Sequence, residues 1–466
     1  MRTFVALLTL VWLLSAGEAS HFHGGTISWS PLWGNKVRFK YQVGWPQDSK
    51  EGGGCTDGDV DLKTILMSSY EWKCTESCSD NVSLTYRCVD HNDRYNWMVG
   101  VGSFNLTLPS NQTSKLTFAN CCWSATMGQT DGVSTTRSNA TDWSLSATIT
   151  VQPRKDTGRI NNSPVTALKA YNRLKAGCQS NISLPFYDHD GDKVRCRLAK
   201  GINECGGACA EIPFGKLIEE NCTLFFNPTA SATGSWVVTL MVEDYPGANI
   251  TVEPYSSVPL QMLLEFVPTK SCCQLSFVRT TPGRNKVFQI PAGSTFNTKI
   301  EIEVDIVGVH VERLGIITDK DVQTDRIQAD ETVQGLFYTY LTWQSEPDRL
   351  GFAQICFYAI STDGDETELR CIFVVPKCTE GSNYTTCVPR NRSTCWSIDA
   401  TPMVTPDCDE GCVCNGNLLW DGDKCVVPND CGCIKQQQYF KVGFHVDLST
   451  LQVMGVVTVW SLLVFL

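Results

Sequence analysis

Residues 378–433 read CTEGSNYTTCVPRNRSTCWSIDATPMVTPDCDEGCVCNGNLLWDGDKCVVPNDCGC, and this stretch guides the interpretation of the whole chain. Nine of the chain's 24 cysteines fall within it. A segment so short, with few aliphatic side chains, cannot bury enough apolar surface to fold alone, so covalent cross-links must hold it together. We therefore expect a small disulfide-rich module at residues 378–433.

The second half of this stretch, CDEGCVC followed by GDKCVVPNDCGC, resembles the trypsin-inhibitor-like cysteine-rich domain of large extracellular glycoproteins such as von Willebrand factor and mucins. The family pattern contains one further bridge, and both of its cysteines are missing here, so no orphan thiol results. The resemblance implies four disulfides, which spacing alone could not establish: Cys378–Cys412, Cys387–Cys408, Cys395–Cys431 and Cys414–Cys425.

Inhibitory members of that family hold a rigid protease-binding loop between two cysteines, which lowers the ordering cost of association. Here the first anchor of the loop is absent, and Thr405-Pro406-Asp407 precede Cys408. A proline or an aspartate at the presented bond suits few serine proteases. We interpret the module as structural, and serine protease inhibition through residues 378–431 is the alternative.

The N-terminus predicts a secreted protein. Residues 1–19 combine Met1-Arg2, the apolar run Phe4–Leu14 and small residues at Gly17 and Ala19, as a signal peptide does. Secretion implies an oxidising compartment and paired cysteines. A high density of N-x-S/T sequons agrees with this and predicts glycosylation; the asparagines are Asn81, Asn105, Asn111, Asn139, Asn181, Asn221, Asn249, Asn383 and Asn391. A further sequon at Asn161 is disfavoured because Pro164 follows its serine.

Composition and motifs narrow the function. The formal net charge is −11, so nucleic acid is an improbable partner. No G-x-S-x-G elbow, H-E-x-x-H zinc pair or phosphate-binding glycine loop occurs in the sequence. Cys205 and Cys209 are separated by three residues, where a redox motif needs two, so we interpret them as structural. The chain is predicted to be non-enzymatic and to need no cofactor, with calcium as an open question.

The length and the recurring period-two alternation predict a mainly β chain of tandem immunoglobulin-like sandwich modules followed by the disulfide-rich module. We expect a β-rich disulfide module at 20–153, a sandwich resembling immunoglobulin and cadherin domains at 160–270, and a third sandwich at 271–376. In the first module, Lys36–Trp45 alternates as a half-buried strand, and Trp143–Val151 closes the module with a second alternating run. The segment His21-Phe22-His23 is interpreted as an exposed strand start, and an N-terminal copper site is the alternative.

The second module contains the most attractive candidate site, Asp188-His189-Asp190-Gly191-Asp192. Three carboxylates at alternate positions offer the oxygen ligands that calcium prefers. The competing interpretation is a tight hairpin turn, for which Asp-Gly is a favoured pair. Because Asp-Gly-Asp recurs at Asp57–Asp59, Asp363–Asp365 and Asp421–Asp423, we favour the turn and keep calcium at Asp188, Asp190 and Asp192 as the alternative.

In the third module, Lys299–Val311 alternates over the length of a long strand. A hairpin is predicted to turn at Asp363-Gly364, with Cys356 and Cys371 placed symmetrically so that they could pair across the strands. Residues 1–376 contain an odd number of cysteines, so one partner lies outside them. Cys433 is left over from the family pairing and could bridge to Cys272, to Cys273 or to another chain.

The tail at 434–466 ends in the apolar run Leu451–Leu466, which is short for a membrane span. We weigh a glycolipid-anchor signal, with attachment at Gly443 or Ser449, against a soluble form. Together these features predict a secreted or surface-tethered matrix glycoprotein with an adhesive or structural role. A mineralised or mucous matrix is the finer expectation. The expected partners are other matrix or cell-surface proteins, and mineral or calcium.

Overall fold

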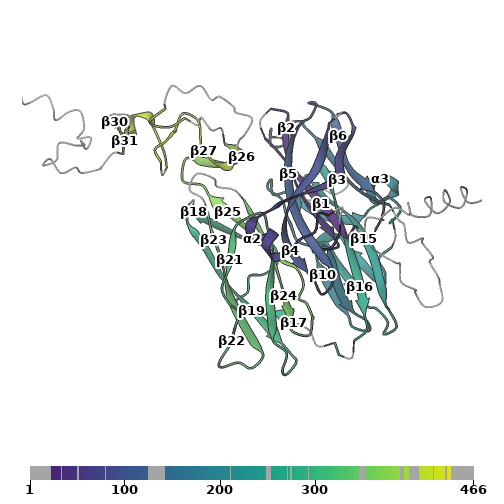
Figure 1. The fold of residues 1–466 in the computed structure, drawn as a ribbon. Helices are drawn as coiled ribbons and strands as arrows, with labels where there is room; N and C mark the ends of the chain where they lie inside the picture. The colour runs from purple at the N-terminus through teal and green to yellow at the C-terminus, as the bar shows by residue number, and fades with distance from the viewer. Residues whose placement is uncertain are drawn as a thin grey trace, which may run out of the picture.

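The computed structural model describes residues 22–441, apart from 33, 50–51, 79, 124–141, 210, 248–252, 270, 273–274, 292, 346–351, 389–392, 398–408, 423 and 436–437. Strands make up 56% of the residues and helices 5%. The prediction of a mainly β chain with sandwich modules and a disulfide-rich module is confirmed (Figure 1). The described residues contain no helix that is long and apolar enough to cross a membrane.

The first module is an antiparallel sheet that curves into a closed ring. Its elements are β1 (Gly24–Pro31), β2 (Lys36–Trp45), α2 (Asp57–Leu62), β3 (Ile65–Glu76), β4 (Asn81–Asn92), β5 (Trp97–Thr107), β6 (Thr113–Asn120) and β7 (Trp143–Thr150). The strands pair in the order β1-β2-β5-β4-β3-β6-β7, and β16 (Ser256–Val267) of the second module pairs with both β7 and β1. The interior is packed with aromatic rings, because Phe22 lies between Trp45, Trp123 and Trp143.

The second module shares that strand. Its other elements are β8 (Val165–Thr166), β9 (Tyr171–Lys175), β10 (Ser180–Ser183), β11 (Phe186–Tyr187), β12 (Lys193–Leu198), α3 (Gly201–Cys205), β13 (Gly215–Ile218), a 3-10 turn (Glu219–Asn221), β14 (Thr223–Phe226) and β15 (Gly234–Tyr245). One sheet continues from β16 through β15 to β12, with β9 parallel to β16, and β10-β14-β13 form a separate sheet. Phe214, Phe226 and Phe266 pack within the same hydrophobic core that fills the ring.

The third module is a separate two-sheet sandwich. Its strands are β17 (Leu275–Phe277), β18 (Lys286–Pro291), β19 (Thr295–Val304), β20 (Val311–Ile317), β21 (Val322–Thr324), β22 (Gln328–Ala329), β23 (Leu336–Gln344), β24 (Ala353–Ser361) and β25 (Arg370–Lys377). One sheet runs β17-β19-β23-β21, with β22 also on β23, and the other runs β18-β25-β24-β20. Their facing side chains form a second core that includes Ile300, Ile302 and Phe357.

The cysteine-rich module contains short paired strands: β26 (Ser382–Val388), β27 (Asp409–Cys414), β28 (Leu419–Trp420), β29 (Cys425–Val426), β30 (Cys433–Lys435) and β31 (Gln438–Phe440), with a 3-10 turn at Pro428–Asp430. The strands pair as β26-β27, β28-β29 and β30-β31. Its apolar core is small and centres on Cys395, Leu419 and Val426. Such a core agrees with the argument that covalent links hold this segment together.

The hairpin loop Ser361–Glu368, between β24 and β25, docks the third module onto the first two, and we call it the docking turn. The Lys169 ammonium and the Glu366 carboxylate form an ion pair whose side chains are 4% and 2% exposed. Lys175 pairs with Asp365. The Tyr95 hydroxyl donates to the Gly364 carbonyl at 3.2 Å. The green third module therefore lies against the purple-to-teal first two (Figure 1).

The period-two alternation correctly predicted which faces are buried in two strands of the first module. Val37, Phe39, Tyr41, Val43 and Trp45 are at most 3% exposed, and so are Trp143, Leu145, Ala147, Ile149 and Val151. The single strand predicted at Lys299–Val311 is wrong: β19 ends at Val304 and β20 begins at Val311. The chain turns between them, where Gly308 has φ +85°, a conformation that glycine adopts readily.

Two further expectations are wrong in this part of the chain. Asp57–Asp59 does not form a hairpin turn but opens α2, because the Thr56 hydroxyl accepts the Asp59 N–H and caps the helix. The strand start at His21-Phe22-His23 is not exposed. Phe22 and His23 are 0% and 3% exposed, because Phe22 packs among the aromatic rings of the interior and His23 lies against Tyr171. His21 lies outside the described residues.

Candidate metal site and cysteine-rich module

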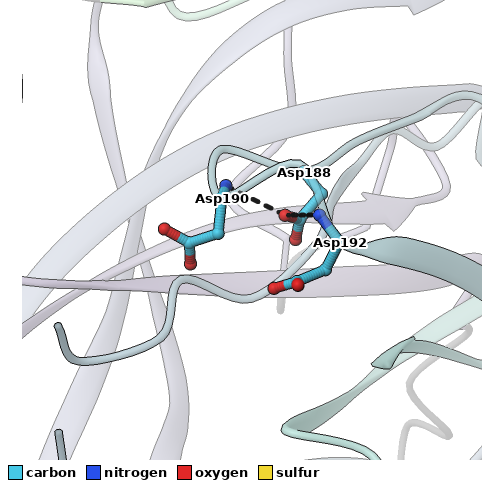
Figure 2. A group of neighbouring side chains, drawn as sticks. All are labelled: Asp188, Asp190 and Asp192. Carbon is cyan, nitrogen blue, oxygen red and sulfur yellow. Dashed lines mark hydrogen bonds between the residues drawn. The ribbon is translucent and has the colours of Figure 1, made fainter. Parts of the chain in front are cut away.

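The loop between β11 and β12 brings three carboxylates together. One oxygen from each of Asp188, Asp190 and Asp192 lies within 4.8 Å of the others (Figure 2). The Asp188 Oδ1 accepts the backbone N–H groups of Asp190 and Asp192, each at 2.9 Å. Gly191, with φ +78°, allows the chain to reverse there. The loop is therefore both a tight turn, as the sequence indicated, and a convergence of acidic side chains.

Arg154 neutralises part of this charge. Its guanidinium donates to both oxygens of Asp192 and to both oxygens of Asp156, and its Nη1 lies 3.6 Å from Asp190. Hydrogen bonding by Arg154 lowers the pKa of the Asp156 carboxyl to about 2. Arg154 is only 8% exposed, so its guanidinium is a fixed part of the fold. One positive charge is thus shared among several carboxylates.

Asp188 and Asp244 are buried carboxyl groups that form no ion pair within the described residues. Asp188 is 9% exposed, and its Oδ2 has no hydrogen-bond partner in the described part of the chain. Burial raises the pKa of Asp188 to about 8, and the nearby Asp244 carboxylate adds to the shift. Burial likewise raises the pKa of Asp244 to about 6, although Ser256 and Asn161 donate hydrogen bonds to it. Buried acidic oxygens without a counter-charge are suited to a hard divalent cation such as calcium.

The linker before β8 completes this cluster. The Asn162 backbone N–H donates to Asp190 at 2.7 Å, and the Asn161 amide donates to Asp244 at 2.6 Å. The sequence analysis did not assign these residues or Asp244 to the site. The sequence did contain local signs that these residues lie in turns or at strand ends. Glu243-Asp244 ends an alternating strand, and Asn161-Asn162 lies just before Ser163-Pro164. Only the fold reveals that the linker, the turn and the end of β15 meet.

Exposure separates the sequon asparagines. Within the described residues, six of the predicted glycosylation positions are exposed: Asn81, Asn105, Asn111, Asn181, Asn221 and Asn383. Asn139, Asn249 and Asn391 lie outside the described residues. Asn161 is 3% exposed, and its amide nitrogen donates to Asp244 and to the Asn162 carbonyl. A glycan on that nitrogen would break both hydrogen bonds, which gives a structural reason to leave Asn161 out of the set.

Disulfides join the strands of each module. In the first two modules the pairs are Cys55–Cys88, Cys74–Cys78, Cys121–Cys122, Cys178–Cys272, Cys196–Cys222 and Cys205–Cys209. In the third, Cys356 and Cys371 face each other on β24 and β25 and are bonded. Because Cys272 bonds to Cys178, the option of a bridge from Cys433 to Cys272 is wrong. The side chains of Cys273 and Cys433 lie outside the described residues.

In the cysteine-rich module, the structure bonds Cys378 to Cys412, Cys395 to Cys431 and Cys414 to Cys425. The side chain of Cys387 and all of Cys408 lie outside the described residues, as do Thr405-Pro406-Asp407 of the inhibitory-loop alternative. The module contacts the candidate metal turn, because the rings of Tyr384 and His189 stack with centroids 6.0 Å apart.

Comparison with known proteins identifies two segments. Residues 23–152 match the family model described as integrin beta-like protein A-E, N-terminal. Residues 378–431 match the model of the trypsin inhibitor like cysteine rich domain. A chimeric titin tandem also matches in structure, at 14% identity over 46% of this chain and 100% of its own. Drosophila N-cadherin matches at 9% identity over 70% of this chain and 95% of its own. Both have a TM-score of 0.18, so no argument is based on them.

Similar curated proteins match parts of the chain. Mouse zonadhesin is 32% identical over 15% of this chain and 1% of its own length. Mouse alpha-tectorin is 30% identical over 14% of this chain and 3% of its own length. Integrin beta-like protein A of Dictyostelium discoideum is 24% identical over 54% of this chain and 12% of its own. The chain thus spans a small part of these relatives.

The matches and the bonded cysteines lead to one conclusion. The chain carries a trypsin-inhibitor-like cysteine-rich domain, of the kind shared with zonadhesin, alpha-tectorin and von Willebrand factor, behind β modules that begin with an integrin beta-like N-terminal domain.

Proposed function

We propose that this protein is a non-enzymatic extracellular glycoprotein that adheres to other matrix or cell-surface proteins. The relatives zonadhesin, alpha-tectorin and integrin beta-like protein A are adhesive extracellular proteins, and this supports the assignment. A deposited or surface-tethered form within a mineralised or mucous matrix is the finer part of the proposal. The tail that would carry a tether, 442–466, lies outside the described residues.

The docking turn is the observation that carries this proposal. Its buried ion pair, Lys169–Glu366, joins the second module to the third, and Tyr95 of the first module donates to its Gly364 carbonyl. The Arg173 guanidinium, which lies 3.8 Å from the centroid of the Tyr95 ring, donates to the Gly364 carbonyl. A rigid multi-module body presents its surfaces in fixed positions, which lowers the ordering cost of binding a partner. Adhesion and scaffolding need such fixed surfaces and no reacting groups.

We further propose that calcium binds at Asp188, Asp190 and Asp192, with Asp244 and Asn162 beside them, and stabilises the junction of the first two modules. The unpartnered Asp188 oxygen supports this proposal. Adding calcium to chelator-treated protein should raise the midpoint of thermal unfolding. Asp188→Asn should abolish that rise, whereas Asp321→Asn, a control at an exposed aspartate elsewhere, should preserve it. No rise in the parent protein would contradict the calcium site.

The adhesive role is tested with the secreted full chain coated on beads and culture dishes. We expect beads to aggregate, or cells to attach, above the level found with albumin. Attachment that never exceeds the albumin control, with or without calcium, would contradict the proposal. Nanomolar inhibition of trypsin, chymotrypsin or elastase by the same preparation would support the inhibitor alternative instead.

A further inference from the structure

A cleft of about 360 Å³ lies between the second and third modules, beside the docking turn. Its lining from the second module comes from β9, β10 and the end of β16. Its lining from the third module comes from β17, the segment after it and the start of β25. This volume falls in the range of roughly 300–1,000 Å³ that small-molecule sites occupy. Because the walls belong to two modules, whatever fills the cleft also joins them.

Asn181 stands on one wall of this cleft. Its neighbour Ile182 packs against the core and is paired with Leu224, which is 0% exposed. Because successive side chains of a strand face opposite ways, Asn181 faces away from that core, and it is exposed. Asn181-Ile182-Ser183 is one of the N-x-S/T sequons. A glycan attached here therefore begins at the wall of the cleft.

The charges that line the cleft are paired. Each of its five cations contacts a carboxylate: Lys169–Glu366, Arg173–Glu265, Lys175–Asp365, Arg284–Glu368 and Arg370–Glu368. Such a lining favours neither a free anion nor a free cation. Guanidinium and carboxylate groups nevertheless have more hydrogen-bonding positions than one ion pair uses. A neutral ligand that both donates and accepts hydrogen bonds, as a sugar does through its hydroxyl groups, suits these walls.

Other lining groups fit the same kind of ligand. Ser180 has a buried hydroxyl oxygen with no hydrogen-bond partner among the described residues, and a ligand hydroxyl would satisfy it. Ile182 and Leu275 add apolar surface, against which the C–H groups of a sugar ring can pack. The cleft thus combines polar groups with apolar surface beside the attachment point of the glycan.

We infer that the first sugars of an N-glycan at Asn181 occupy this cleft and brace the third module against the second. The covalent tether keeps the sugars beside the walls, so they lose little freedom when they bind. In place, they also shield from water the Lys175–Asp365 ion pair, whose side chains are 17% and 28% exposed. The attraction within an ion pair is stronger where less water surrounds it. The glycan thereby reinforces the docking turn.

The order of events during secretion allows this arrangement. The glycan is transferred when the Asn181 amide nitrogen forms a bond to the first sugar of a lipid-linked donor. The sugar–phosphate bond of the donor breaks, and the amide proton leaves with the lipid diphosphate. When transfer precedes folding, the second and third modules close around a sugar that is already attached.

The first test uses the secreted full chain from mammalian cells and measures how fast each glycan is removed from the folded protein. Peptide N-glycosidase converts a freed asparagine to aspartate, and peptide mass spectrometry follows that change site by site. Asn105 and Asn221, exposed sequon residues outside the lining, are the references. We expect release from Asn181 to be about tenfold slower than from the references, because the enzyme acts there only when the cleft opens. In denatured protein the rates should be alike.

The second test removes the glycan by substitution and follows limited proteolysis between the second and third modules. Asn181→Gln and Ser183→Ala both destroy the sequon, and the protease should cleave them there several times faster than the parent. Ser183→Thr keeps the sequon and should resemble the parent. Asn221→Gln, a matched loss of a glycan elsewhere on the second module, should also resemble the parent.

Each outcome decides the inference. A parent protein without a glycan at Asn181 overturns it, as does release from the folded protein at the rate of the references. If Ser183→Thr carries the glycan and is cleaved as fast as Ser183→Ala, the effect belongs to the side chain at position 183 and the inference is also overturned. The release measurement uses only the parent protein, so it decides the inference even where a variant fails to fold. Neither test reads adhesion, so failure here would leave the proposed adhesive role unaffected.

Discussion

At the scale of single residues, Asp188 makes the metal-free protein sensitive to pH. Burial raises the pKa of its carboxyl to about 8 in the folded state, against about 4 for an exposed aspartate. Between these values the folded protein retains a proton that the unfolded chain has lost. The free energy of unfolding therefore falls as pH rises from about 4 to about 8, and it becomes independent of this group above about pH 8. The raised pKa of Asp190 and of Asp244 acts in the same direction.

Chemical denaturation in chelator at several pH values measures this effect. The parent protein should lose stability between pH 5 and pH 8. Asp188→Asn should show a shallower decline, because the amide does not titrate. Unfolding free energies that rise through this range in the parent, with no difference in the variant, would contradict the assignment of the shift to Asp188.

The disulfides differ in what they contribute to stability. Cys178–Cys272 spans 94 residues, whereas Cys74–Cys78 spans 4. Cross-links that close longer loops remove more entropy from the unfolded chain, which gives about 5 kcal/mol for the first and about 2 kcal/mol for the second. Replacing both cysteines of each pair by serine should lower the unfolding free energy in that order. Equal losses from denaturant titration would contradict this loop-length argument.

At the scale of elements, strand patterns could be predicted from sequence, but contacts between distant loops could not. Alternation located the buried face of Lys36–Trp45, because a strand exposes its two faces in turn. The same pattern failed at Glu301, because its position between the buried Ile300 and Ile302 predicts an outward-facing side chain but the residue is 5% exposed. Thr280 and Thr281 donate hydrogen bonds to Glu301, and Lys299 pairs with it. Asp188–Asp192 was visible as an acidic turn, whereas its neighbours Asp244 and Asn162 are brought in only by the fold.

Gly364 tests the docking turn, because a side chain there would meet the first module. A Cβ on this residue would lie 2.0 Å from the Tyr95 hydroxyl oxygen. Gly191 occupies an identical Asp-Gly-Asp triplet with a similar positive φ, and nothing lies within 4 Å of its Cβ position. Both alanine variants incur backbone strain of about 1 to 2 kcal/mol. Gly364→Ala should in addition disrupt docking and cost more than Gly191→Ala.

The comparison is made without calcium, so that the metal turn does not contribute. Limited proteolysis should cleave Gly364→Ala between the second and third modules faster than the parent, while Gly191→Ala should resemble the parent at that junction. Equal destabilisation and equal cleavage of the two variants would show that the docking turn does not hold the third module in place.

At the scale of the whole molecule, β16 belongs to two modules. Met262, Gln261 and Leu260 pair with β1 on one side, while the same strand pairs along its length with β15 on the other. One hydrophobic core runs continuously through the first two modules and reaches Tyr358 of the third. The modules predicted at 20–153 and 160–270 therefore share the strand β16. A boundary placed in the linear sequence does not reveal this sharing.

This sharing predicts that residues 20–153 do not fold alone. Without β16, the ring would expose the edges of β1 and β7 and the aromatic core around Phe22. We expect that fragment to aggregate or to lack a cooperative unfolding transition, whereas 20–272, which retains the Cys178–Cys272 bond, should be monomeric and unfold cooperatively. Size-exclusion chromatography and near-ultraviolet circular dichroism distinguish these outcomes. A soluble, monomeric 20–153 with a sharp transition would mean that β16 merely packs against a ring that is stable without it, and that the two modules are energetically independent.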